Sequence, residues 1–224
     1  MVYLIIVVIF ILFGPHLWAK RILSRYNREE YFSGNGIDLA RMVLEHLDLD
    51  DVKVEVTDTA DHYDPVNKTI RLTEERCGRR TLTAIVVAAH EVGHAMQDHA
   101  GYKPLRMRTR LIGTAAKLER VGAALMMAVP VIAVLTRVPS VGLLMFIGGL
   151  FTLFTPVVVH LLTLPTEIDA SYRRALPLLS SGNYIPPEDI PAARKILRAC
   201  SLTYVANSLM GILNIWRWIR VLRR

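Results

Sequence analysis

The residue pattern that most constrains this chain is His-Glu-Val-Gly-His at residues 90–94, which matches HExxH. It lies in the segment Thr81–Gln97, which is rich in alanine and aliphatic residues and contains no proline, so a helix is predicted there. Residues four apart share one face of a helix, so His90 and His94 can present two imidazole nitrogens to one metal ion. Glu91 then lies beside them, where its carboxylate can polarise a water molecule. The pattern therefore predicts a metal site of the kind found in zinc hydrolases.

The apolar run Ala84–Ala89 predicts that this helix is buried. Two histidines and a glutamate in a buried helix are costly unless they bind a ligand or pair with one another. A histidine pair that only packs in the core or faces solvent is the alternative, because three fixed positions also occur by chance in unrelated proteins. A catalytic zinc site also needs a third protein ligand, with water in the fourth position.

Residues close to the motif do not supply this third ligand. Metzincins carry a glycine and a histidine three and six positions after the second histidine, whereas this chain has Gln97 and Ala100 there. His99 follows His94 by five residues, which is about 140° around a continuing helix, so it points away. The third ligand must therefore come from farther along the chain.

Few acidic residues follow the motif: Asp98, Glu119, Glu167, Asp169, Glu188 and Asp189. The first is too close on the same helix, and the second lies in the charged lead-in to an apolar segment. The last two follow a pair of prolines, where carboxylates stabilise a helix N-terminus. Of the two that remain, Glu167 is the predicted third ligand, as in gluzincins. The alternative is an acid that reaches the membrane interface from the end of an apolar helix.

Three long segments carry no Lys, Arg, Asp or Glu: Val2–Ala19, Val121–Thr136 and Val141–Pro165. With hydrophobic residues making up 52% of the 224 positions, they predict a protein partly embedded in a bilayer. The first segment lacks the features of a cleavable signal, so it is expected to remain as a transmembrane anchor. The other two predict a transmembrane helical hairpin, although its first arm covers only about 24 Å of a bilayer core of about 30 Å.

Basic residues flank these segments mainly on one side. Four of them (Lys20, Arg21, Arg25 and Arg28) follow the first segment, whereas the hairpin tip carries only Arg137. The positive-inside rule then places the N-terminus and the tip outside, and residues 20–120 and those after 165 in the cytoplasm. Five more (Arg106, Arg108, Arg110, Lys117 and Arg120) are expected to lie against anionic lipid headgroups. The net charge of +7 therefore does not require a nucleic-acid partner, for which no basic and aromatic pattern exists.

Between the anchor and the hairpin lies ordinary globular sequence. Ile37–Leu47 has the period of an amphipathic helix, and residues 52–56 alternate like a half-exposed strand. A turn at Asp64–Lys68 precedes a second short strand at Thr69–Thr73. With the HExxH helix, these elements predict a small zincin-like α+β unit in a mainly helical chain.

The C-terminal part predicts a short helix over about residues 188–200 and then an apolar stretch, Leu202–Ile215, that ends in RWIRVLRR. Its four arginines favour packing at the membrane interface, and a span over residues 202–222 is the alternative. The predicted organisation is a transmembrane anchor at 1–19, a cytoplasmic catalytic region at 20–120, a transmembrane hairpin at 121–165 and a C-terminal helical region at 166–224 with the third ligand.

Six stretches of the chain are TADHYDP, IRLTEE, AAHEVGHAMQ, GYKPLRMR, LPTEIDASYRRAL and LTYVANSLM. In this order they resemble the YugP-type neutral zinc metallopeptidases, a bacterial membrane family, over nearly the whole chain. The resemblance implies a zinc-dependent membrane peptidase of the inner membrane, with Glu167 in the position of the third ligand. Better-known gluzincins have an aspartate four residues after this glutamate, whereas Asp169 follows by two. Asp169, and His160 within an apolar segment, are candidates for supporting the ligands.

The predicted activity is hydrolysis of peptide bonds in a protein or peptide substrate, with zinc on the three ligands and Glu91 as the base. His62 and Tyr63 are candidates for the donor that stabilises the oxyanion, and turn or core packing is the alternative for both. An intramembrane protease of the site-2 type fits less well, because the apolar run before His90 is short. The competing class is a non-proteolytic membrane adaptor that keeps a zinc site, for which Glu91 would have no use.

Overall fold

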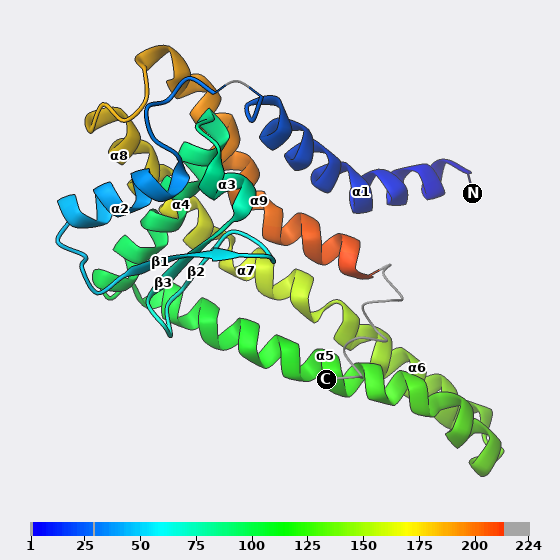
Figure 1. Cartoon of the computed structure of the whole chain (residues 1–224). Helices are drawn as coiled ribbons and strands as arrows, with labels where there is room; N and C mark the ends of the chain where they lie inside the picture. The colour runs from blue at the N-terminus through cyan, green and yellow to red at the C-terminus, as the bar shows by residue number, and fades with distance from the viewer. Residues whose placement is uncertain (1, 29, 213–224) are drawn as a thin grey trace.

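The structure, a computed structural model, describes residues 2–28 and 30–212 and is a mainly helical α+β fold with one small sheet (Figure 1). The HExxH segment forms helix α4 (Leu82–His99), as predicted. Thr81 caps this helix, because its hydroxyl accepts a hydrogen bond from the Ala84 amide at 3.2 Å. Fifteen of its residues are buried, so α4 runs through the interior of the globular part.

A three-stranded sheet in the order β1-β3-β2 lies beside α4. Strand β1 (Lys53–Thr57) runs parallel to β3 (Thr69–Thr73), and β2 (His62–Asp64) pairs antiparallel with β3. The two longer strands confirm the prediction, but β2 was not predicted as a strand. Three residues are too few to show an alternating pattern, so only the pairing with β3 defines β2.

Helix α2 (Gly36–His46) confirms the predicted amphipathic helix to within one residue at each end. Asn35 and Asp38 form a capping box at its start, in which each side chain accepts a hydrogen bond from the other residue's amide. Its apolar face packs with α4 in one core that also includes the sheet and α9. The short helix α3 (Glu74–Gly78) connects β3 to the loop before α4.

Four helices pack side by side in the order α1, α9, α7 and α5 (Figure 1). Their bounds are Val2–Arg25 for α1, Ile190–Ile212 for α9, Thr155–Ile168 for α7 and Lys103–Thr136 for α5. Helix α6 (Pro139–Leu153) packs against α5 and completes the predicted hairpin. The second arm, predicted as one segment, is two helices that break at Phe154, because Pro156 lacks the amide that would continue α6.

Within the described residues, no helix is long and apolar enough to span a membrane. The membrane crossings expected for residues 1–19 and 121–165 therefore stay predictions. Helix α9 joins the predicted 188–200 helix and the start of the following apolar stretch without a break. The remainder of that stretch and its arginines, residues 213–224, lie outside the described residues.

After α7 the chain crosses α4 as a π-helical segment, η1 (Asp169–Ala175), which leads into α8 (Leu176–Ser181) and a 3₁₀ turn at Pro187–Asp189. The two segments approach closely at Gly93, where an added Cβ would lie 2.6 Å from the Ala170 carbonyl oxygen. Such a contact is tolerated only when the residue has no side chain. The glycine inside the HExxH motif therefore allows η1 to lie directly against the face that carries the two histidines.

Candidate metal centre

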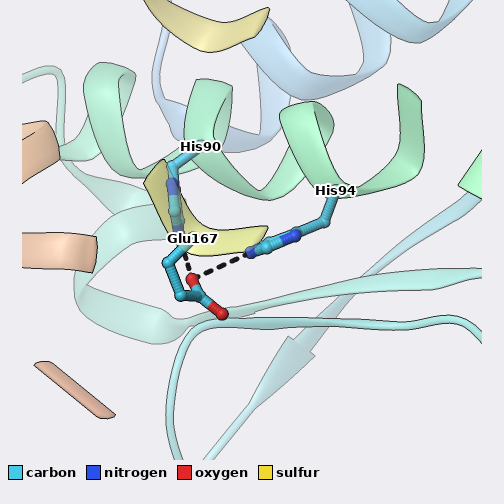
Figure 2. Close-up of side chains that lie close together, drawn as sticks. All are labelled: His90, His94 and Glu167. Atoms are coloured by element: carbon cyan, nitrogen blue, oxygen red, sulfur yellow. Dashed lines mark hydrogen bonds and ion pairs between the residues drawn. The ribbon is translucent and has the colours of Figure 1, made fainter. Parts of the chain in front are cut away.

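His90, His94 and Glu167 meet in the interior, between α4 and the end of α7 (Figure 2). The Oε2 atom of Glu167 lies 3.4 Å from Nε2 of His90 and 3.2 Å from Nε2 of His94. The three ligand atoms lie within 4.8 Å of one another, and none of the three residues exposes more than 2% of its surface. The structure thus brings together the two histidines of one helix and an acid 73 positions later in the chain.

His94 is held by the side-chain amide of Gln97, one turn later on α4. The Nε2 atom of Gln97 donates to the Thr166 carbonyl at 2.9 Å and to the Asp169 carboxylate at 2.8 Å. Its Oε1 atom is therefore the one that faces His94, 2.9 Å from Nδ1. Since an amide oxygen can only accept, Nδ1 of His94 carries a proton, and in the neutral imidazole Nε2 is then the nitrogen with the free lone pair.

His90 is held by hydroxyl groups instead. Its Nδ1 atom lies 3.0 Å from the Ser171 hydroxyl, which is 2.8 Å from the Ser201 hydroxyl. Ser201 in turn donates to the Leu197 carbonyl at 2.9 Å. The donors can all point along this chain toward the carbonyl, so that Nδ1 of His90 donates to Ser171 and Nε2 of the neutral His90 also has the free lone pair.

When both imidazoles are neutral, as they are in a metal ligand, three lone-pair atoms face one another in a buried site. Two unprotonated imidazole nitrogens and a carboxylate oxygen repel one another unless a cation lies among them. Nε2 of His90 and Oε2 of Glu91 have no hydrogen-bond partner within the described residues. Two imidazoles and one carboxylate are the protein ligands of a catalytic zinc site. The residues present therefore fit zinc.

The pKa values of the two carboxylates of the site are shifted in opposite directions. Burial raises the pKa of Glu91 to about 7. Burial acts in the same direction on Glu167, but the positive charge around it, including the Arg108 guanidinium, outweighs burial and holds the pKa of Glu167 well below its usual value. Glu167 is therefore an ionised ligand, whereas Glu91 can exchange a proton near neutral pH.

Arg108 overturns one expectation from the sequence. It was predicted to face lipid headgroups, but its side chain is only 8% exposed, and Nη2 lies 2.8 Å from Oε1 of Glu167. Arg106 and Arg110 on the same helix are exposed, and their contact with lipid stays a prediction. The prediction for Arg108 was wrong because charge and sequence position alone do not show which face of α5 turns toward the end of α7.

The other predicted site residues lie in different surroundings. Asp169 joins the site indirectly, through Gln97, and is also bound by Nε of Arg174 at 3.0 Å. His160 stacks on the Tyr204 ring, with centroids 5.6 Å apart. Tyr63 is buried, and its hydroxyl donates to Asp98 at the end of α4, while Nδ1 of His62 contacts the Ala60 carbonyl. Within the described part of the chain, the hydrogen bonds of His62 and Tyr63 do not join either residue to the three ligands.

Four residues of the site were not singled out from the sequence: Gln97, Arg108, Ser171 and Ser201. Gln97 follows His94 by three positions, so the helical period alone could have placed the two side chains together. The others come from α5, η1 and α9: Arg108 and Ser171 lie in stretches that resemble the family, whereas Ser201 directly precedes such a stretch. Their roles depend on tertiary contacts between distant segments.

Comparisons with known proteins agree with this site. The sequence profile of a family described as "Putative neutral zinc metallopeptidase" matches residues 1–223. The chain is 32% identical over 215 residues to a Bacillus subtilis (strain 168) protein named "Putative membrane protease YugP", a match that covers 93% of this chain and 92% of that protein. No solved structure matches the chain.

Proposed function

This chain belongs to the neutral zinc metallopeptidase family, and we propose that it is a gluzincin-like endopeptidase that cleaves protein or peptide substrates beside a membrane. The observation that carries the proposal is the convergence of the Nε2 atoms of His90 and His94 on Oε2 of Glu167, with Glu91 next in sequence to His90. Zinc is the cofactor of the family, and this group could hold it.

Different residues of the site have different roles in the proposed peptide hydrolysis. Zinc, when bound, supplies Lewis-acid chemistry that lowers the pKa of a water molecule to about 7. Glu91 takes the proton as the water attacks the peptide carbonyl and gives it to the leaving amine. A pKa of about 7 suits both transfers. Gln97 and Ser171 keep the two imidazoles in the tautomer that leaves Nε2 free.

The proposed setting is the cytoplasmic side of the inner membrane, with residues 1–19 as an anchor and residues 121–165 as a hairpin. It is supported by the uncharged segments, by the distribution of basic residues and by the name of the Bacillus subtilis relative. Substrates would be membrane proteins or unfolded segments close to the bilayer. The hairpin would then be part of the active site, because Glu167 lies at the end of its last helix.

The test of the proposed function is Glu91→Gln, which removes the base and keeps the side-chain volume. We expect purified full-length protein to keep its zinc and to lose about 10²–10⁴-fold in cleavage rate. Glu188→Gln, a change at an exposed glutamate, is the matched control and should cleave at the normal rate. Comparison of the proteomes of cells with wild type and Glu91→Gln would then show which proteins accumulate.

A non-proteolytic adaptor that retains zinc is the second candidate function. It predicts that Glu91→Gln changes neither cleavage by the purified protein nor the cellular proteome. A buried carboxylate oxygen of Glu91 without a hydrogen-bond partner within the described residues argues against this candidate. Such a group is costly to keep, and a structural zinc site does not need it.

A further inference from the structure

Arg108 lies in the stretch GYKPLRMR, which the proposed mechanism leaves without a role. Its Nη2 atom is at ion-pair distance from Oε1 of Glu167, but the geometry is not that of an aligned hydrogen bond. Nε of Arg108 has no hydrogen-bond partner in the part of the chain that the structure describes. A buried guanidinium is costly, so its place against a proposed metal ligand calls for a functional reason.

The two carboxylate oxygens of Glu167 face different partners. Oε2 faces the two histidine nitrogens, whereas Oε1 faces Arg108. We propose that Arg108 is a positioning residue that holds Oε1 away from the metal, so that Glu167 binds zinc through Oε2 alone. The inference rests on the proposed role of Glu167 as the third ligand.

An aromatic stack fixes the guanidinium in this place. The central carbon of the Arg108 guanidinium lies 5.0 Å from the centroid of the Tyr204 ring, and the His160 ring stacks on the same ring. A planar guanidinium can stack on a ring and pair with a carboxylate at the same time. The stack connects α5, α9 and α7, and it gives His160 a role as a support for the ring.

Binding through one oxygen preserves the reactive position of the site. A catalytic zinc has three protein ligands and keeps the fourth position for water or substrate. A carboxylate that binds through both oxygens occupies one more position. Arg108 therefore keeps a position available for the chemistry.

The experiment uses purified full-length protein loaded with Co²⁺ in place of zinc, because its visible absorption is strong in four-coordinate and weak in five-coordinate sites. Arg108→Met is expected to bind one Co²⁺ and to lose much of this absorption, as Oε1 joins the metal. The zinc-loaded variant should lose about 10–100-fold in cleavage rate. Arg110→Met, at an exposed position on the same helix, should show the wild-type spectrum.

A second variant covers the case in which Arg108→Met does not fold. Tyr204→Leu keeps the charge pair but removes the ring, so its Co²⁺-loaded form should lose part of the visible absorption. Tyr204→Phe keeps the ring and should show the wild-type absorption. A folded Arg108→Met or Tyr204→Leu protein with the wild-type spectrum overturns the inference. If the wild-type chain binds neither metal, the proposed function itself fails, so the two failures are distinguishable.

Discussion

His90 and His94 sit one turn apart on the same helix and point the same nitrogen at the same oxygen, yet different chemistry holds them. His94 is backed by an amide that is tied to the Asp169 carboxylate and, through it, to Arg174. His90 is backed by hydroxyl groups that end at a backbone carbonyl. We call Gln97, Asp169 and Arg174 the charged arm of the site, because they end in charged groups. Ser171 and Ser201 are the neutral arm.

The difference between the two arms indicates which substitutions should weaken the support of the histidines most. Hydrogen bonds to charged groups are stronger than those between neutral groups, so a change in the charged arm should cost more. Both arms pass through η1, one at Asp169 and the other at Ser171, so both depend on the close approach of η1 to α4 at Gly93. A change at the crossing should weaken both arms, a change at Gln97 only the charged arm, and a change at Ser171 only the neutral arm.

Gly93→Ala is expected to have the largest effect, because it acts on both arms at once. The new Cβ would lie 2.6 Å from the Ala170 carbonyl oxygen, so η1 must move away from α4. Overpacking of this kind costs about 1–3 kcal/mol of unfolding free energy. A shift of about 1 Å at a reacting group costs about 100-fold in rate, so cleavage should fall by at least that factor. Thermal unfolding and a peptide-cleavage assay measure the two effects.

The matched control for this change is Gly113→Ala on α5, where an added Cβ meets no atom within 4 Å. Alanine is favoured over glycine in a helix by about 1 kcal/mol, so the control should be as stable as wild type or more stable. Normal cleavage by Gly93→Ala would show that the two arms do not depend on the crossing.

Gln97→Met should have the next largest effect. Methionine fills a similar volume but cannot accept the proton of His94 Nδ1 or donate to Asp169, so it removes the charged arm. We expect zinc affinity to fall by about 100-fold, as measured by competition with a chelator of known affinity. His99→Gln, at an exposed position near the end of the same helix, should keep the wild-type affinity. Unchanged affinity in Gln97→Met would contradict a supporting role for the amide.

The half of the site on α4 was accessible from the sequence because it depends on local geometry. The helical period places His90 and His94 on one face, and Thr81 marks the start of the helix. The choice of Glu167 came from elimination among a few acids and from a predicted hairpin that returns to the same side. The structure brings Glu167 to the two histidines, although whether α5–α7 cross a bilayer stays a prediction.

The other half depends on contacts that no local pattern encodes. Little in the sequence supported a role of Asp169 beside the ligands. It follows Glu167 by two positions, and on a regular helix its side chain would point away from that of Glu167. The chain becomes π-helical at Asp169, and Gln97 reaches across to it from α4. Arg108 was assigned to lipid for a similar reason, since the sequence does not show which face of α5 meets α7. Long-range contacts decided both cases.

Ser171→Ala should have the smallest effect of the series. It removes the acceptor for Nδ1 of His90, but Ser201 keeps its hydrogen bond to the Leu197 carbonyl, and no charge is left unpaired. We expect zinc affinity to fall by about 10-fold, the lower end of the range for lost ligand support. Ser180→Ala, at an exposed serine of α8, is the control. If Ser171→Ala lost as much zinc affinity as Gln97→Met, the neutral arm would hold its imidazole as firmly as the charged arm. The proposed difference between the two arms would then be wrong.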